Sequence, residues 1–254
     1  MNGEEIIMKT EEKTDEQSSL NLSKNFANTC INKELIDLNF KKCIQGYHLV
    51  NTSPVNETIW EDLNSLIFTS VGIEVYLQSE GSHLPGMDIN TSIGGISNKS
   101  SKYLTKKQNR IDISSYRLTT VCSDKHCGDP KDIIQEINKR KNFEYYSIIV
   151  RDEMDKEQIT YYWLLIPSNH DVVNPSSYNW EPTFGKRGKN KDAQVGWHTN
   201  SINGSNMSIA FSMSSQLWMH IEMTDEIKKF VIASCTALKK TKYNYIELMD
   251  KVNN

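Results

Sequence analysis

The chain of 254 residues has a hydrophobic content of 37% and a formal net charge of −3. This length is enough for one large domain or two small ones, and the apolar content is adequate for a core. No apolar run of about 18 residues occurs, which excludes a membrane-spanning helix and predicts no membrane partner. The N-terminus has no basic start followed by an apolar run, so we expect no secretory signal.

The five cysteines predict a cytoplasmic protein, because an odd number of thiols without an export signal is typical of reduced cysteines. Four residues separate Cys122 from Cys127, and His126 lies between them. A zinc site would need a fourth ligand and usually has tighter spacing. The sequence therefore favours two free thiols in a loop over a metal site.

Charge is distributed unevenly along the chain. Residues 1–20 contain six acids and two lysines, and we expect them to form a disordered N-terminal extension. Residues 21–254 are expected to form a single domain. Two basic runs without acids lie within it, at residues 99–110 and 186–191. Local basic surface on a nearly neutral body favours an enzyme that binds a polyanion, although a solvated loop explains each run equally well.

Two helices are expected before the first strand, the first over residues 33–46. The second is expected to begin with Ser53 as its cap and Pro54 in its first turn. Its apolar residues recur at helical spacing: Val55, Ile59, Leu63, Leu66, Ile67 and Val71. Glu57 and Glu61 lie four residues apart and therefore share a face of this helix.

Strand-like segments follow, rich in β-branched and aromatic residues: 73–79, 87–90, 95–103, 113–121, 143–153, 158–167, 207–213 and 216–223. A short helix is expected over residues 130–142, and a loop-rich region over residues 167–185. Residues 224–240 are expected to close the domain as an amphipathic helix. Its inward-facing residues would be Ile227, Phe230, Val231, Ser234 and Leu238.

This order of elements predicts an α/β fold with a mixed central β-sheet flanked by helices. The strands that carry Asp88 and Lys99 are expected to be neighbours in that sheet. Within the domain we expect one part over residues 50–170 and a second part over residues 171–223. The C-terminal helix at residues 224–240 would complete it.

Asp88, Ser97 and Lys99 form a pattern suited to phosphodiester hydrolysis. That reaction needs a metal against the scissile phosphate, an activated water and neutralisation of the developing charge. Lys99 follows Asp88 by eleven residues, which suits a strand, a tight turn and a second strand. Ser97 and Lys99 would point to the same side, because strand side chains alternate. An Asp before a turn and a Lys on an edge strand are nevertheless also common structural residues.

The segment Pro85-Gly86-Met87-Asp88-Ile89 together with Ser97-Asn98-Lys99 resembles the active-site signature of the PD-(D/E)XK nucleases, and specifically of type II restriction endonucleases. The resemblance covers roughly residues 55–150 and implies a restriction-endonuclease-like core. It implies Mg²⁺-dependent hydrolysis of double-stranded DNA, with Asp88 as a metal ligand and Lys99 positioning or activating the water. Ser97, or the main-chain carbonyl of Asn98, would complete the metal's ligands.

The signature departs from the usual pattern at Ser97, where the family usually has Asp or Glu. Because Mg²⁺ prefers carboxylate and water ligands, another acid should compensate. The family often supplies a Glu from the helix before the strands, so Glu61 is the first choice and Glu57 the second. Glu80, beside the metal loop, is the third. His83 in the same loop could contact phosphate, although a lone loop histidine is more often structural.

Reading of base edges usually requires Arg, Lys, Asn or Gln side chains. Residues 184–206 combine such side chains with four glycines that let the backbone come close, although a mobile surface loop has a similar composition. The residues expected to bind DNA are Lys102, Arg117, Lys186, Arg187, Lys189, Lys191, Gln194, Trp197, His198 and Asn200. Trp218, in contrast, is expected in the core.

The sequence thus predicts a sequence-specific double-strand DNA endonuclease of the restriction type, with a catalytic core over residues 50–170 and a DNA-recognition part over residues 171–223. A homodimer is expected by analogy, because one subunit per strand matches the two-fold symmetry of a palindrome. Two alternatives stay open: a non-catalytic DNA-binding or regulatory protein that kept the fold, and a monomeric repair or nicking nuclease.

Overall fold

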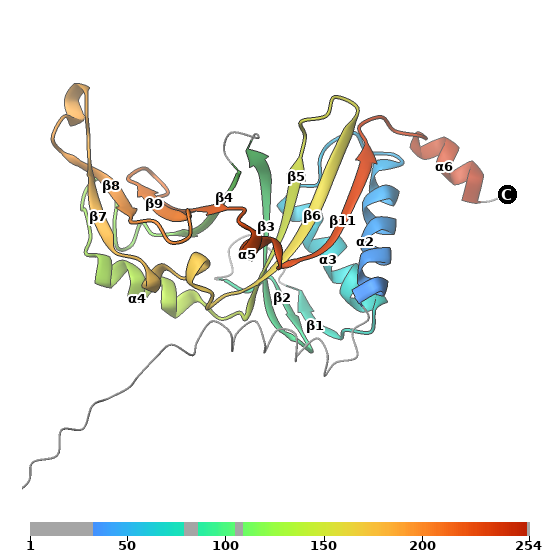
Figure 1. The fold of residues 1–254 in the computed structure, drawn as a ribbon, viewed down its shortest axis with the longest axis horizontal. Helices are drawn as coiled ribbons and strands as arrows, with labels where there is room; N and C mark the ends of the chain where they lie inside the picture. The colour runs from blue at the N-terminus through green and yellow to red at the C-terminus, as the bar shows by residue number, and fades with distance from the viewer. Residues whose placement is uncertain (1–32, 79–85, 105–108, 253–254) are drawn as a thin grey trace, which may run out of the picture.

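The computed structural model describes residues 33–78, 86–104 and 109–252 (Figure 1). Its strands are β1 Val75–Gln78, β2 Ile89–Thr91, β3 Gly94–Leu104, β4 Arg110–Arg117, β5 Tyr145–Asp152, β6 Gln158–Pro167, β7 Trp180–Phe184, β8 Gln194–Thr199, β9 Asn206–Ala210, β10 Gln216–Glu222 and β11 Val231–Leu238. Its helices are α2 Lys33–His48, α3 Glu57–Ser70, α4 Pro130–Arg140, α5 Asp225–Lys228 and α6 Tyr245–Val252, with 3₁₀ turns at η1 Asp171–Val173, η2 Pro175–Ser177 and η3 Gly188–Asn190.

The strands form one mixed sheet with the order β11-β6-β5-β3-β4-β10-β9-β8-β7, and β2 and β1 branch from β3. The β3–β5 pair is parallel, whereas the other described pairs are antiparallel. The expected α/β class with a mixed sheet flanked by helices is therefore confirmed. Within the described ranges, no helix is long and apolar enough to cross a membrane.

Helices α2 and α3 cover one face of the β5-β6-β11 part of the sheet (Figure 1). The core between them is aromatic: Trp60 of α3 and Trp163 of β6 meet edge to face, with ring centroids 5.2 Å apart. Both indole N–H groups are satisfied at Ser147 of β5, since Trp60 donates to its carbonyl (3.2 Å) and Trp163 to its hydroxyl (2.9 Å). These bonds fix α3 against β5, the strand next to β3, on which Lys99 lies.

A second core lies between α4 and the other half of the sheet. Ile133 and Ile137 of α4 are buried in it. Alternate residues of three neighbouring strands are buried in the same core: Ile111 and Ile113 of β4, Leu217, Met219 and Ile221 of β10, and Met207 and Ile209 of β9. The residues between these positions therefore project from the opposite, outer face of β4, β10 and β9.

The start of the second helix was predicted wrongly. Helix α3 begins at Glu57, and the side chain of Asn56, not that of Ser53, caps it by accepting a hydrogen bond from the Ile59 amide (3.0 Å). Val55, just ahead of the cap, is fully buried, and its amide donates to the Tyr161 hydroxyl (3.1 Å) and not to a helical carbonyl. The buried face carries Trp60, Asn64, Ile67 and Phe68, which leaves Leu66 exposed.

The C-terminal helix expected over residues 224–240 is also wrong. Only α5 is helical there, and residues 231–238 form β11, which pairs antiparallel with β6. Ala233, Cys235 and Ala237 face the core in the period of two that a strand requires. Ser234 and Leu238, which a helix would have turned inward, are exposed. The inward residues of β11 are small because α2 packs on them. Their weak apolar pattern did not distinguish the strand period of two from the helix period of 3.6.

Strand β7 lies at the end of the region expected to be loop-rich, residues 167–185, and β8 lies within residues 184–206, for which no strand was expected. The two strands form a hairpin beyond β9. Pro182 lies in β7, the last strand in the order, where a missing amide costs no ladder hydrogen bond. The N-terminal extension expected over residues 1–20 lies outside the described residues.

Candidate active site

Asp88, Ser97, Asn98 and Lys99 lie together where the sheet opens beside β3. Strand β2 pairs with β3 only as far as Ile96, and β4 pairs with it only from Tyr103. Among the described strands, none pairs with β3 between these points on that edge. The main-chain N–H and C=O of Asn98 point into this opening, because both groups of a strand residue face the same edge.

The Asp88 carboxylate occupies the opening. Its Oδ2 accepts hydrogen bonds from the Asn98 amide (2.5 Å) and the Ser97 hydroxyl (3.4 Å). The Asp88 amide donates to the carbonyl of Ile96 (2.8 Å), so the backbone is held as well. Burial raises the pKa of Asp88, although the Lys99 charge and the Asn98 N–H oppose the rise. Ionisation of Asp88 therefore still costs free energy, and a nearby cation would lower that cost.

Gly86 makes this placement possible. Its φ is +90°, and a side chain there would overlap the main-chain carbonyl of Arg140 at the end of α4. Only glycine has low strain in that region of backbone space and leaves room for the carbonyl. The glycine two residues before Asp88 is thus a steric requirement for bringing the acid to the edge of β3.

The Lys99 ammonium joins the strand to the helix. It donates to Glu57 Oε1 (2.7 Å) and to the carbonyl of Asn98 (2.6 Å), and it lies 4.0 Å from Asp88 Oδ2. Burial disfavours its charge, but Glu57 and Asp88 outweigh that effect and raise the pKa of Lys99. Lys99 is therefore a cation at neutral pH. It suits neutralisation of phosphate charge and orientation of a water better than abstraction of a proton.

Glu61 follows Glu57 by one helical turn and faces the same opening. Burial, followed by repulsion from Asp88 and Glu57, raises the pKa of Glu61 from 4.5 to about 7. Three carboxylates thus surround one ammonium, which leaves an excess of negative charge when all are ionised. Glu57 proves to be the acid bonded to Lys99, whereas Glu61, the first choice from sequence, faces Asp88 without that bond.

A divalent cation fits this set of donors. Within the described ranges, no three His, Cys, Asp or Glu side chains form a metal site by themselves. Mg²⁺, however, commonly takes one or two carboxylates and completes its shell with water and phosphate oxygens. Asp88, the Asn98 carbonyl and Glu61 would supply such a partial shell, and the excess carboxylate charge favours it.

The Asn98 side chain takes no part in this set. Asn98 pairs with Ser147 in the β3–β5 register and shares its face of the sheet, toward α3. The side chain is fully buried, and both its Oδ1 and its Nδ2 have no hydrogen-bond partner. A metal contact from Asn98 would therefore come from its main-chain carbonyl.

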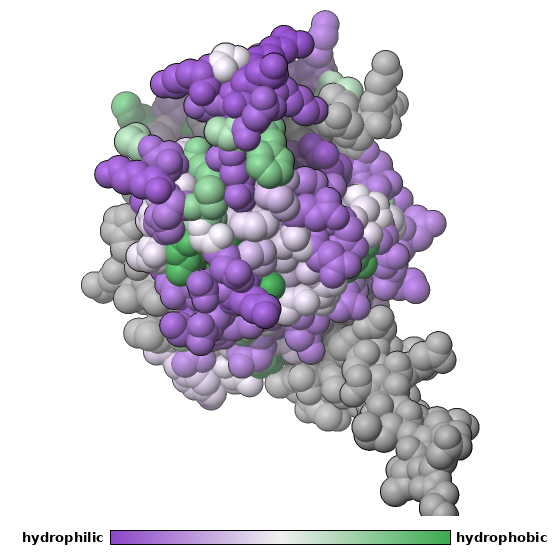
Figure 2. Space-filling model, turned by 90° about the vertical axis from the view of Figure 1, so that its left-hand side faces the viewer, coloured by the Kyte–Doolittle hydropathy of each residue, from purple (hydrophilic) through white to green (hydrophobic). Residues whose placement is uncertain are grey.

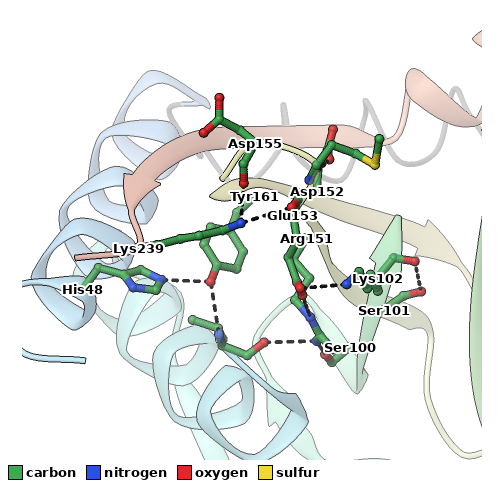
Figure 3. A network of polar contacts seen from close by, with 12 residues as sticks. His48, Ser100, Ser101, Lys102, Arg151, Asp152, Glu153, Asp155, Tyr161 and Lys239 are labelled. Atoms are coloured by element: carbon green, nitrogen blue, oxygen red, sulfur yellow. Dashed lines mark hydrogen bonds and ion pairs between the residues drawn. The ribbon is translucent and has the colours of Figure 1, made fainter. Parts of the chain in front are cut away.

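A polar network behind the site fixes the start of α3 (Figure 3). Tyr161 accepts a hydrogen bond from the Val55 amide (3.1 Å) and is itself bonded to His48 (2.8 Å). Arg151 contacts the Val55 carbonyl (3.4 Å) and the hydroxyl of Ser100 (2.9 Å), the residue after Lys99. The network thereby links the two backbone segments that carry Glu57 and Lys99, and neither Arg151 nor Tyr161 was expected from the sequence.

The residues expected to bind DNA are spread over the other half of the sheet. Lys102 of β3 bonds to Glu153 (2.8 Å) and stays half exposed (Figure 3). Arg117 is exposed at the end of β4. The basic run Lys186, Arg187, Lys189 and Lys191 is exposed at the tip of the β7–β8 hairpin, where Figure 2 shows a hydrophilic cluster.

Trp197 cannot stack on DNA, which corrects the expectation from sequence. It is buried in the second core, and its indole donates to the Cys127 carbonyl (2.8 Å). His198, the next residue, is exposed on the outer face. Gln194 bonds to the carbonyl of Gly196 (3.2 Å), and the Asn200 side chain accepts from the Asn179 amide (2.8 Å), so both are partly engaged within the protein.

Trp218, expected in the core, is 40% exposed on the outer face. Cys122 is buried and Cys127 exposed, and no metal-binding group of described residues includes them. Glu80 and His83 lie outside the described residues.

No protein-family model, curated protein or solved structure matches the chain significantly. Function must therefore be inferred from the geometry.

Proposed function

We propose that this protein is a Mg²⁺-dependent endonuclease that cuts double-stranded DNA at specific sequences, on a restriction-endonuclease-like core. The observation that carries the proposal is the cluster at the open edge of β3. There the Asp88 carboxylate lies 4.0 Å from the Lys99 ammonium, and the main-chain groups of Asn98 lie between them. The arrangement supplies a metal ligand and a fixed cation for phosphate, which are the main requirements of phosphodiester hydrolysis.

Each residue has a definite task in this proposal. Asp88, Glu61 and the Asn98 carbonyl would hold Mg²⁺, which supplies Lewis-acid activation of the phosphate and of a water. The Lys99 ammonium neutralises charge on the phosphate and orients the attacking water. Ser97 holds the Asp88 carboxylate by its hydrogen bond, and Glu57 keeps Lys99 charged and in place.

The biological setting belongs to the same proposal. A cytoplasmic homodimer with one active site per DNA strand would match the symmetry of a palindromic site. Residues 171–223, which carry the β7–β8 hairpin and its basic tip, would contribute to DNA recognition.

A non-catalytic DNA-binding protein is the second candidate, and a specific contact favours it. The Lys99 ammonium already donates to the Asn98 carbonyl, which is the oxygen that a cation would use. In a protein that had lost catalysis, this internal hydrogen bond would be the final state of the site.

Incubation of supercoiled plasmid with the protein and Mg²⁺ separates the candidates. Discrete linear fragments support the endonuclease, nicked circles alone support a monomeric nicking enzyme, and retained binding without cleavage supports the non-catalytic protein. Asp88→Asn should abolish cleavage and spare DNA binding. Asp124→Asn, in an exposed loop away from the site, is the matched control. Wild-type cleavage by Asp88→Asn would remove Asp88 from the chemistry.

A further inference from the structure

The outer face of β4, β10, β9 and β8 carries a straight row of side chains. His198 of β8 pairs with Ser208 of β9, Ser208 pairs with Trp218 of β10, and Trp218 pairs with Ser114 of β4. Residues opposite each other in antiparallel strands share a face. The four residues therefore form one line across four strands, and its length is about 14 Å at the usual strand spacing.

This outer row is accessible and chemically unusual for the back of a sheet. Trp218 is 40% exposed, and the His198 side chain is 49% exposed. Within the row and on its flanks, most outward side chains are uncharged hydrogen-bonding groups: Gln216, His220, Asn206 and Thr183. Such groups match the donors and acceptors on base edges, whereas they give little attraction for phosphate.

Ser208, a member of the row, is held in a fixed orientation by His220 on its flank. His220 Nδ1 lies 2.7 Å from Asp112 Oδ1, and His220 Nε2 lies 2.9 Å from the Ser208 hydroxyl. Because a carboxylate only accepts, Nδ1 carries a proton, and in the neutral imidazole Nε2 accepts from the Ser208 hydroxyl. The Ser208 oxygen then keeps its lone pairs for an outside donor, such as the exocyclic amino group of adenine or cytosine.

The residue that pairs with His198 at the β7 end of the row is an acid, Glu181, whose carboxylate lies 3.7 Å from the imidazole, and basic residues lie farther out on both sides. Lys102 is on β3, beside β4, and the run Lys186 to Lys191 lies at the tip joining β7 and β8. A row with few charges of its own, set between two basic margins, is complementary to a DNA groove between two phosphate backbones. The row length is comparable with the width of the major groove, about 12 Å. The row also begins on β4, next to the opening in which Asp88 and Lys99 lie.

We infer that this outer row is the surface that reads the DNA sequence, with His198, Ser208 and Trp218 contacting base edges. The inference rests on the proposed endonuclease function and names the residues that set its specificity. It also gives Trp218 and His198, rather than the lysines of the hairpin tip, the discriminating role.

The test compares cleavage preferences on a library of random duplexes, read by sequencing the cut ends. Trp218→Ala and His198→Ala should each lower the ratio of cleavage at the preferred site to cleavage at other sites by about ten- to hundred-fold. Trp218→Phe, which keeps an aromatic ring, should lose less. Tyr245→Ala, an exposed aromatic on α6, is the matched control and should keep the ratio. Unchanged preferences in both alanine variants would overturn the inference.

A wild-type protein that leaves the library uncut would refute the endonuclease function and not this surface. The surface is then tested by binding of the same duplexes in EDTA. A loss of affinity of at least about ten-fold in Trp218→Ala and His198→Ala, but not in Tyr245→Ala, would support it. Equal affinities would overturn it.

Discussion

Lys99→Met measures how strongly the ammonium compensates the carboxylates of the candidate site. Methionine keeps most of the side chain's length and removes only the charge. At an effective dielectric constant of about 20, a charge pair at 4.0 Å, the Lys99–Asp88 distance, gains about 4 kcal/mol. Glu57 is 42% exposed, so water screens its pair with Lys99, and we assign it at most about 1 kcal/mol. Since methionine avoids the cost of burying the ammonium, the expected net loss of unfolding free energy is about 1–3 kcal/mol.

Urea denaturation in EDTA at neutral pH measures that loss. Lys102→Met is the matched control, because Lys102 pairs with Glu153 at 2.8 Å but is 53% exposed, and it should lose less than about 1 kcal/mol. Mg²⁺ at about a hundred times its dissociation constant from Lys99→Met should stabilise that variant by about 2.7 kcal/mol and the wild type by less. A Lys99→Met variant as stable as the wild type, without a larger response to Mg²⁺, would refute the reasoning.

Three further changes probe the same region, each by urea denaturation. The pKa of Glu61 is raised to about 7, so its stabilising neutral form is fully present below pH 4.5 and is lost as the pH rises through 7. In EDTA, Glu61→Gln should therefore gain stability relative to the wild type at pH 8 and gain none at pH 4; an equal difference at both pH values contradicts the raised pKa. Asn98→Val should raise the unfolding free energy by about 1 kcal/mol, because it removes a buried amide without partners; a loss would mean that the amide is satisfied in solution. Gly86→Ala should cost more than Gly72→Ala, by about 1–3 kcal/mol, because both glycines have positive φ but only Gly86 has no room for a side chain; equal costs would contradict the close contact with Arg140.

The arrangement of Asp88, Ser97 and Lys99 could be predicted from the sequence because these residues are close along the chain. Asp88 and Lys99 are joined by a hairpin, and strand alternation alone determines which residues share a face. The acid from the helix was harder to rank, since its position depends on where α3 begins. A cap at Asn56 puts Glu57 in the first turn, close to Lys99. Placing the cap at Ser53 hid this signal.

The outer face was misread because residues 184–206 were taken as a loop. In a strand, neighbouring residues point to opposite faces, so a wrong choice of strand or register exchanges buried and exposed residues. Trp197 was expected to face DNA and is buried, whereas Trp218 was expected in the core and is exposed. Composition could not show which of the two tryptophans is buried. That depends on which face of the sheet α4 covers, and only the pairing of β8, β9 and β10 defines that face.

In the proposed nuclease site, Ser97 stands where the signature that it resembles usually has a second acid, and the position of α3 shows how such a site could keep its negative charge. A divalent cation needs carboxylate ligands close together, and these ligands can come from a strand or from a helix. Here β3 contributes a neutral hydroxyl that holds Asp88, and α3 contributes Glu57 and Glu61. A helix can do this only if it is fixed relative to the strand. The bonds of Trp60 to Ser147 and of Tyr161 and Arg151 to Val55 provide that fixation. In the proposed site, the negative charge that Ser97 does not supply would therefore come from α3.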